Sequence, residues 1–337
     1  MASVKAADPA ASELLVVRLL AKALAPTRAA SAGSVRRGKV VEVGIGDDAA
    51  VLRLGRERLV VSVDDQVEGE HFDLRWLSLE DVGYRALQAA ASDLAAMGAM
   101  PLAAVASLHV PRGFSAKRLA SLARGQAQAA RALGCPVVGG NLTRGPALAV
   151  STTVLGRARK PLLRSGAKPG DELWLSGEVG WARAGFLLHS QGLKVPSRLR
   201  QVAAHARKAW ARPQAQIAAG LALVGRARAA IDLSDGLAGD SRQLARASGV
   251  KAVVELARLS GLVSQQLAEL GELLGEPGVA LALTGGEDYA LLSAGPKARR
   301  PPRAKVVGRI ERGRGAELEL ENGRRFALGP SFDHLRG

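Results

Sequence analysis

The chain has 337 residues, 47% of them hydrophobic, which is enough to bury one large core or two smaller ones. Its net charge of +16 suggests a polyanionic ligand, but the basic residues are scattered along the chain. Its five Phe, four Trp and two Tyr are not interleaved with them as in a base-stacking platform. Nucleic acid is therefore not expected as the main partner. Cys135 is the single cysteine, so an intrachain disulfide and a cysteine-bound metal are excluded.

The apolar segments do not predict a membrane helix. The longest uncharged run near the middle, 94–108, is shorter than the about 20 residues that a spanning helix needs, and Gly98 and Pro101 interrupt it. The N-terminal segment 1–15 lacks the basic start and continuous apolar core of a secretory signal. We therefore expect a cytoplasmic protein without a membrane partner.

Strand-like and helical segments are mixed along the chain, which predicts an α/β or α+β fold. The clearest helix begins after Ser78 and ends at Gly98, with Asp81 placed to complete a capping box. A first helix is expected to start near Ser12. Strands are predicted at 40–43, 50–54, 59–63, 103–109, 147–155, 172–176, 229–233, 252–255, 280–283, 289–293 and 305–310, and helices at 79–97, 115–133, 181–190, 200–223, 236–247 and 262–274.

A domain boundary is expected within 157–170, where Pro, Gly and basic residues replace the apolar pattern of a strand. This places one domain at 13–158 and a second at 159–335.

Four acidic motifs stand out in this basic chain: GIGDDAAV (44–51), SVDDQVEGEHF (62–72), ASDLAAMGA (91–99) and IDLSDGLAGD (231–240). In three of them the carboxylates are expected directly after a strand, where side chains reach a ligand crevice. Asp93 instead lies on the predicted helix, on the same face as Val82, Ala86 and Ala90. Any one such Asp is more often a turn former or a helix cap, but four motifs together indicate a site that needs cations.

An oxygen-rich site without cysteine suits Mg²⁺, held by a few carboxylates together with substrate phosphates. Two glycine-rich stretches, VVGGNLTRGP (137–146) and LTGGEDYALL (283–292), would let backbone N–H groups approach phosphate oxygens, although Gly-Gly pairs are more often plain turns. No GxxxxGK[ST] sequence is present, so a nucleotide would be held mainly through metal and backbone. His71 follows the acidic loop, which favours a substrate contact over a packing role.

These motifs, in this order, resemble those of the thiamine-monophosphate kinases, a family related to aminoimidazole ribonucleotide synthetase, selenophosphate synthetase and a hydrogenase maturation protein. The resemblance covers about residues 13–335. It rests on GIGDDAAV, VEGEHF, SDLAAMGAMP, GGNLTRGP, RSGAKPGDELWLSG, IDLSDGL, GGEDYALL and SFDHL.

The resemblance implies ATP-dependent phosphorylation of thiamine monophosphate to thiamine diphosphate. ATP is the implied co-substrate, several Mg²⁺ ions assist direct transfer, and no side chain acts as a nucleophile. The implied fold is α/β overall, with an α+β N-terminal domain and an α/β C-terminal domain as in aminoimidazole ribonucleotide synthetase. Two subunits are expected to form a homodimer that shares a β-barrel built from their N-terminal strands.

By the family pattern, the residues fall into three groups. The metal positions match Asp48, Ser62, Asp64, Asp93, Asn141, Asp232 and Asp235; the ATP positions match Gly140, Asn141, Arg164 and Ser234; and the substrate positions match His71, Glu287 and Phe332.

Two residues depart from the pattern. Val63 replaces a threonine before Asp64, and Asn141 replaces an aspartate after Gly-Gly, so each offers less to a cation. A related ATP-using synthetase or maturation enzyme, or a weakly active nucleotide-binding regulatory homologue, is the alternative. Selenophosphate synthetase would need a reactive cysteine near the N-terminus and the maturation protein a cysteine at the C-terminus, and the single Cys135 is at neither position.

Overall fold

The computed structural model describes residues 40–329. The helix expected to start near Ser12 and the predicted substrate residue Phe332 lie outside the described residues.

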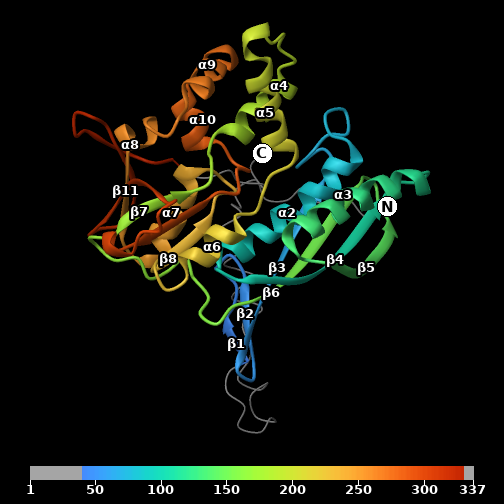
Figure 1. Ribbon diagram of the computed structural model, residues 1–337, viewed down its shortest axis with the longest axis horizontal. Helices are drawn as coiled ribbons and strands as arrows, with labels where there is room; N and C mark the ends of the chain where they lie inside the picture. The colour runs from blue at the N-terminus through green and yellow to red at the C-terminus, as the bar shows by residue number, and fades with distance from the viewer. Residues whose placement is uncertain (1–39, 330–337) are drawn as a thin grey trace, which may run out of the picture.

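The N-terminal half forms a six-stranded sheet within the described residues, in the order β1-β2-β3-β6-β4-β5. Neighbouring strands are antiparallel except for β4 and β5, which are parallel. Helices α2 and α3 lie together on one side of the sheet, which we call its inner face (Figure 1). The bounds are β1 Val41–Val43, β2 Ala50–Leu54, β3 Glu57–Val67, β4 Met100–Val110, β5 Val137–Arg144, β6 Ala149–Arg157, α2 Leu79–Ala96 and α3 Ala116–Leu133.

The predicted capping box of α2 is present. The Ser78 side chain accepts from the backbone N–H of Asp81, and the Asp81 side chain accepts from the backbone N–H of Ser78. Glycines bring α2 and α3 close together: an ideal Cβ on Gly83 would lie 2.1 Å from the carbonyl oxygen of Leu122, and one on Gly125 would lie 1.9 Å from that of Glu80. The two backbones are therefore in direct contact.

The C-terminal half forms a second, mainly antiparallel sheet in the order β13-β12-β9-β11-β7-β10-β8, in which only β12 and β9 pair in parallel among the described residues. Helices α4, α5, α9 and α10 gather at one end of the molecule (Figure 1). The strands are β7 Glu172–Ser176, β8 Ala229–Asp232, β9 Lys251–Glu255, β10 Leu291–Gly295, β11 Lys305–Glu311, β12 Gly315–Glu319 and β13 Arg325–Ala327; the α-helices are α4 Trp181–Ser190, α5 Arg200–Ala211, α6 Ile217–Leu223, α7 Leu237–Ser248, α8 Leu256–Ser260, α9 Gln265–Leu274 and α10 Gly278–Thr284.

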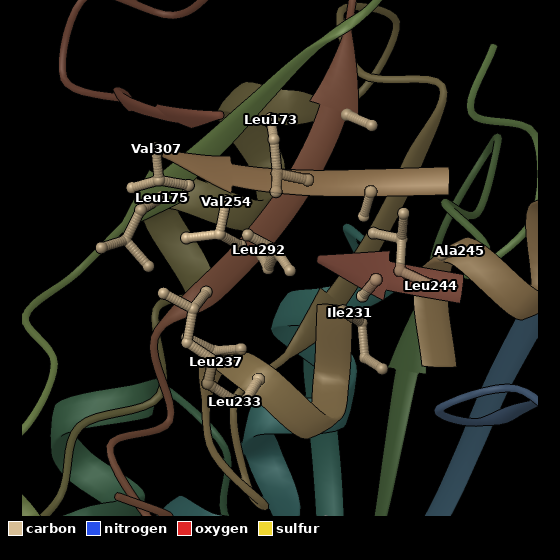
Figure 2. Packing of buried hydrophobic residues seen from close by; sticks show 14 of the residues in the cluster. Leu173, Leu175, Ile231, Leu233, Leu237, Leu244, Ala245, Val254, Leu292 and Val307 are labelled. Carbon is tan, nitrogen blue, oxygen red and sulfur yellow. The ribbon is translucent and has the colours of Figure 1, made fainter. Parts of the chain in front are cut away.

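One face of this sheet packs against α7. Figure 2 shows Leu173, Ile231 and Leu292 of three different strands together with Leu237 and Leu244 of the helix, all of them buried. This cluster is the largest apolar core of the C-terminal half among the described residues. It stabilises the sheet by removing apolar surface from water.

Helix α2 contacts both sheets. Leu87 and Leu94 belong to the same buried cluster as Val60 of the N-terminal sheet. Ala95 and Ala96, at the end of the helix, belong to a cluster with Trp174 and Ala230 of the C-terminal sheet. The helix is therefore shared between the two cores.

Several sequence predictions of elements were wrong in detail. Residues 280–283, predicted as a strand, lie in helix α10. The helix predicted over 200–223 is divided into α5 and α6 around Pro213, because proline lacks the N–H that a helix interior needs. Three strands were not predicted: β5, β12 and β13. Strand β3 runs to Val67, so Asp64 lies within it rather than after it.

We expect Gly125→Ala to destabilise the protein by about 1–3 kcal/mol, because the new methyl group would overlap the carbonyl oxygen of Glu80. Helix propensity alone would favour alanine over glycine by about 1 kcal/mol. Urea unfolding would measure the change, and Ala123→Gly, at an exposed position of the same helix, would calibrate propensity. A more stable Gly125→Ala protein would show that the contact between α2 and α3 is looser than described.

Candidate functional site

Three predicted metal residues meet between the two halves of the chain. Asp48 follows β1, Asp93 lies in the last turns of α2 and Asp232 ends β8, yet each offers a carboxylate oxygen within 4.8 Å of the others. Their oxygens are the hard ligands that Mg²⁺ prefers. We call these three residues the carboxylate cluster.

The carboxylate cluster is electrostatically unfavourable by itself. Burial raises the pKa of Asp48 to about 7, although the Arg164 guanidinium opposes the shift. Burial also raises the pKa of Asp93 well above its usual range, and the charges of Asp232 and Asp48 add to the effect. The pKa of Asp232 is raised as well, again chiefly by burial. A divalent cation would relieve this repulsion.

The donor set fits such a cation. The Asp48 Oδ2 atom is buried and has no hydrogen-bond partner among the described residues, so an oxygen is free to bind a metal. The Ser62 hydroxyl donates to Asp93 Oδ2, which places a further oxygen beside the cluster. Asp64 lies on the same face of β3 as Ser62, and burial raises its pKa to about 6. The structure therefore places Ser62 beside the cluster, and the Asp64 side chain projects from the same face of β3.

Arg164 joins the cluster to the C-terminal half. Its Nε and one terminal nitrogen donate to Asp48 Oδ1 at 3.0 and 2.8 Å, and its backbone N–H donates to Asp47 at 3.1 Å. Its other terminal nitrogen donates to Gln243 Oε1 at 3.0 Å. The Gln243 amide in turn donates to Asp235 and Asp240, at 3.2 Å each. The predicted ATP residue Arg164 and the predicted metal residue Asp235 are thus linked through one glutamine.

Asn141 lies away from the carboxylate cluster within this chain. It pairs in register with Ser107, and that row continues through Ser151 to Asp65, on the face of the sheet opposite to Asp64. The row of paired residues that contains Asp64 ends at Gly140 on β5, which is three strand spacings, or about 14 Å, from Asp64. Asn141 is exposed on the edge strand β5, and the close approach of β5 to β4 requires Gly140, where an ideal Cβ would lie 1.7 Å from the Ala106 carbonyl oxygen.

Val63 also lies on the face of the sheet away from the helices. Its side chain alternates with those of Ser62 and Asp64, and 63% of the residue surface is exposed. The loss of a threonine oxygen at this position therefore does not remove an oxygen from the carboxylate cluster of the same chain.

The loops that carry Ser234 and Glu287 are bonded to each other. The backbone N–H of Glu287 donates to the carbonyl of Ser234 at 2.8 Å, and that of Tyr289 donates to Leu233 at 3.0 Å. The Ser234 residue is exposed. The Glu287 carboxylate accepts from Arg85 and from Trp210 Nε1, the latter at 2.9 Å.

His71 lies in the turn after β3, where its Nδ1 accepts from the backbone N–H of Val67 at 3.3 Å. It is partly buried, so a local packing role and a ligand contact are both compatible with its position.

Four residues near the predicted site were missed from the sequence: Arg85, Gln243, Asp240 and Asp288. Asp288 caps helix α4 from a distant loop by accepting from the backbone N–H groups of Gly180 and Ala182, and burial raises its pKa to about 7. A signal existed for Arg85, which lies three residues after Val82 on the buried stripe of α2. Asp240 and Asp288 lie within the motifs IDLSDGLAGD and LTGGEDYALL, whereas Gln243 belongs to no such motif.

Comparison with known proteins identifies the family. The AIR synthase related protein N-terminal domain matches residues 46–158, and the corresponding C-terminal domain matches 168–321. A thiamine-monophosphate kinase of Mycobacterium tuberculosis is 37% identical over 279 residues, covering 82% of this chain and 81% of the relative. One of Escherichia coli is 38% identical over 279 residues, covering 80% of this chain and 81% of the relative.

Solved structures agree with the sequence comparison. A structure of AaThiL complexed with AMPPCP and TMP matches with a TM-score of 0.83 and 29% identity, covering 96% of this chain and 97% of that one. The hydrogenase maturation protein HypE shares the fold, with a TM-score of 0.65 and 20% identity, covering 84% of this chain and 91% of that one.

Among residues 40–329, no helix is both long and apolar enough to cross a membrane. The expected two-domain fold is confirmed, whereas the shared β-barrel stays a prediction. On the family models and the relatives together, the chain belongs to the thiamine-monophosphate kinase family of AIR synthase related proteins.

Proposed function

We propose that this protein transfers a phosphoryl group from ATP to thiamine monophosphate and so forms thiamine diphosphate. The observation that carries the proposal is the carboxylate cluster, formed by both halves of a chain whose relatives are thiamine-monophosphate kinases. AaThiL, which has been crystallised with AMPPCP and TMP, supports ATP and thiamine monophosphate as the ligands.

Phosphoryl transfer needs positioning and neutralisation of charge more than covalent chemistry by the protein. In the proposed site, Asp48, Asp93 and Asp232 hold Mg²⁺, with Ser62, Asp64 and Asp235 as further ligands, and Mg²⁺ when bound supplies positive charge to the phosphate oxygens. Arg164 and Ser234 are assigned to ATP, and so by the family pattern are Gly140 and Asn141, although these two lie away from the cluster within one chain. His71, Glu287 and Phe332 are assigned to the acceptor. No side chain is assigned as a nucleophile.

Arg164 would have two tasks in this site. It fixes the Asp48 carboxylate by a fork of two hydrogen bonds, which leaves Asp48 Oδ2 as the open oxygen. Because a guanidinium also matches phosphate oxygens, Arg164 could exchange part of this pairing for a phosphate of ATP.

We further propose that two copies form a homodimer through the outer face of the N-terminal sheet, the face opposite to α2 and α3. Exposed apolar residues gather on the strands of this sheet, and β5 leaves an open edge. They include Val63 of β3, Met100 and Leu102 of β4, and Val138 of β5. The domain division at 158/159 and the cytoplasmic location remain proposals of the same kind.

Activity gives the most direct test of the proposed function. With ATP, Mg²⁺ and thiamine monophosphate, we expect the wild type to form thiamine diphosphate, and Asp93→Asn to lower kcat by about 100-fold or more, because it removes a charge that holds the metal. Chromatography of the thiamine phosphates would measure the product. Glu57→Ala, which removes an exposed carboxylate from strand β3, serves as the control. A wild type that leaves thiamine monophosphate unchanged would contradict the proposal.

Metal-dependent stability gives a second test. The pKa of Asp48 is raised from 3.8 to about 7, so the stability due to its protonated form is fully present below about pH 4 and is lost as the pH rises through 7. We therefore expect the metal-free protein to melt at a lower temperature at pH 8 than at pH 5, and Mg²⁺ to restore stability at pH 8. In Asp93→Asn, the metal-free protein should be more stable at pH 8 and should respond less to Mg²⁺. An equal response to Mg²⁺ in both proteins would remove Asp93 from the metal site.

Light scattering tests the homodimer. We expect a mass of twice the 35.0 kDa of one chain at micromolar concentration. Val63→Glu would place a charge in the proposed interface and should give monomers, whereas Leu193→Glu, at another exposed apolar position, should not. Dimers that persist in Val63→Glu would indicate that a different surface is used.

A further inference from the structure

Arg85 is a fully buried cation that joins the two halves of the chain. It lies on α2, where its side chain has 0% exposure, and each of its three nitrogens donates to a different group. Its Nε donates to Gln66 Oε1 at 2.8 Å, one terminal nitrogen donates to the carbonyl of Trp210, and the other donates to Glu287 Oε1. Its guanidinium carbon also lies 5.4 Å from the centre of a Trp210 ring.

Glu287 has an unusual backbone conformation. Its φ is +64°, and that of Tyr289 is +50°, although neither residue is glycine. The left-handed region is unfavourable for side chains with a Cβ, and such residues gather at functional sites where the surroundings hold them. Here the hydrogen bond from Glu287 N–H to Ser234 and that from Tyr289 N–H to Leu233 hold the loop.

The Glu287 carboxylate is fixed at both oxygens. Arg85 donates to Oε1, and Trp210 Nε1 donates to Oε2 at 2.9 Å. The side chain is nevertheless 31% exposed, and each carboxylate oxygen can accept more than one hydrogen bond. One side of the carboxylate is therefore presented in a single orientation toward a ligand.

Arg85 also faces the metal side of the site. It interacts electrostatically with Asp64 as well as with Glu287. Gln66, which accepts from Arg85, lies two residues beyond Asp64 on the same face of β3. Arg85 thus lies between a carboxylate assigned to the metal and a carboxylate assigned to the acceptor.

We propose that Arg85 is a positioning residue that, with Trp210, holds the Glu287 carboxylate in the orientation that binds the phosphate acceptor, and so sets the affinity for thiamine monophosphate rather than for ATP. The inference rests on the proposed function. The thiazolium cation and the amino group of thiamine monophosphate are both groups that pair with a carboxylate. An ion pair that only tied the two halves together would instead affect stability, or both substrates alike.

The chain supplies a matched control. Arg212 also joins the C-terminal half to α2, by an ion pair with Asp81 one turn before Arg85, and it donates to Gln128 at 2.8 Å. It makes no contact with Glu287 among the interactions of the described residues. Arg212→Lys therefore perturbs a second, more exposed ion pair between the halves without disturbing the Glu287 carboxylate.

The experiment compares wild type, Arg85→Lys, Trp210→Phe and Arg212→Lys by KM for each substrate, kcat and melting temperature. Arg85→Lys keeps the charge but loses the planar fork, and we expect it to raise KM for thiamine monophosphate about tenfold while KM for ATP is unchanged. Trp210→Phe, which removes the indole N–H together with the five-membered part of the buried ring, should shift the same constant in the same direction, and it tests the point even if Arg85→Lys does not fold. Arg212→Lys should lower the melting temperature without changing the ratio of the two KM values.

The outcomes separate this inference from the proposed function. If the wild type phosphorylates thiamine monophosphate but Trp210→Phe keeps its acceptor KM, or if both KM values rise together, the positioning role of Arg85 and Trp210 is wrong and the kinase proposal stands. If the wild type neither phosphorylates nor binds thiamine monophosphate, measured by quenching of tryptophan fluorescence, both proposals are wrong.

Discussion

Helix α2 packs against both sheets, and the positions of the functional side chains depend on that contact. Three of its residues face different partners: Asp81 pairs with Arg212, Arg85 pairs with Glu287, and Asp93 lies against Asp48 and Asp232. They lie four and eight residues apart, on one side of the helix, at a rise of about 1.5 Å per residue. Small side chains and Gly83 in α2, together with Gly125 and Gly220 of neighbouring helices, allow these helices to approach α2 closely, so the spacing of the site is set by a rigid element rather than by loops.

The carboxylate cluster costs stability in order to bind a cation. Burial raises the pKa of all three acids, the charges of Asp232 and Asp48 add to the shift of Asp93, and Arg164, which hydrogen-bonds to Asp48, opposes the shifts of Asp48 and Asp232 only in part. A core built only for stability would replace such groups with apolar residues. Their retention beside an unpaired Asp48 oxygen is what a metal-binding site requires.

The sequence predicted the parts of this arrangement that follow from local patterns. The capping box at Ser78 and the inward face of Asp93 both depend on helical spacing, and both are confirmed. Two wrong predictions of elements have local causes. The apolar run at 280–283 fits a strand or a buried helix equally well, and two glycines interrupt the apolar pattern of strand β5. The meeting of Arg85 with Glu287 could not be predicted, since 202 residues separate them and no periodicity connects the two halves.

The sharing of α2 also limits how the molecule can move. Two domains with a small polar interface can usually rotate about a linker when a ligand binds. In this protein, separation of the halves would strip Leu87 and Leu94 from one core or Ala95 and Ala96 from the other. Hinge opening at the boundary is therefore costly, and ligands must bind without separation of the two halves. Any closure over the substrates has to come from loops rather than from motion of whole domains.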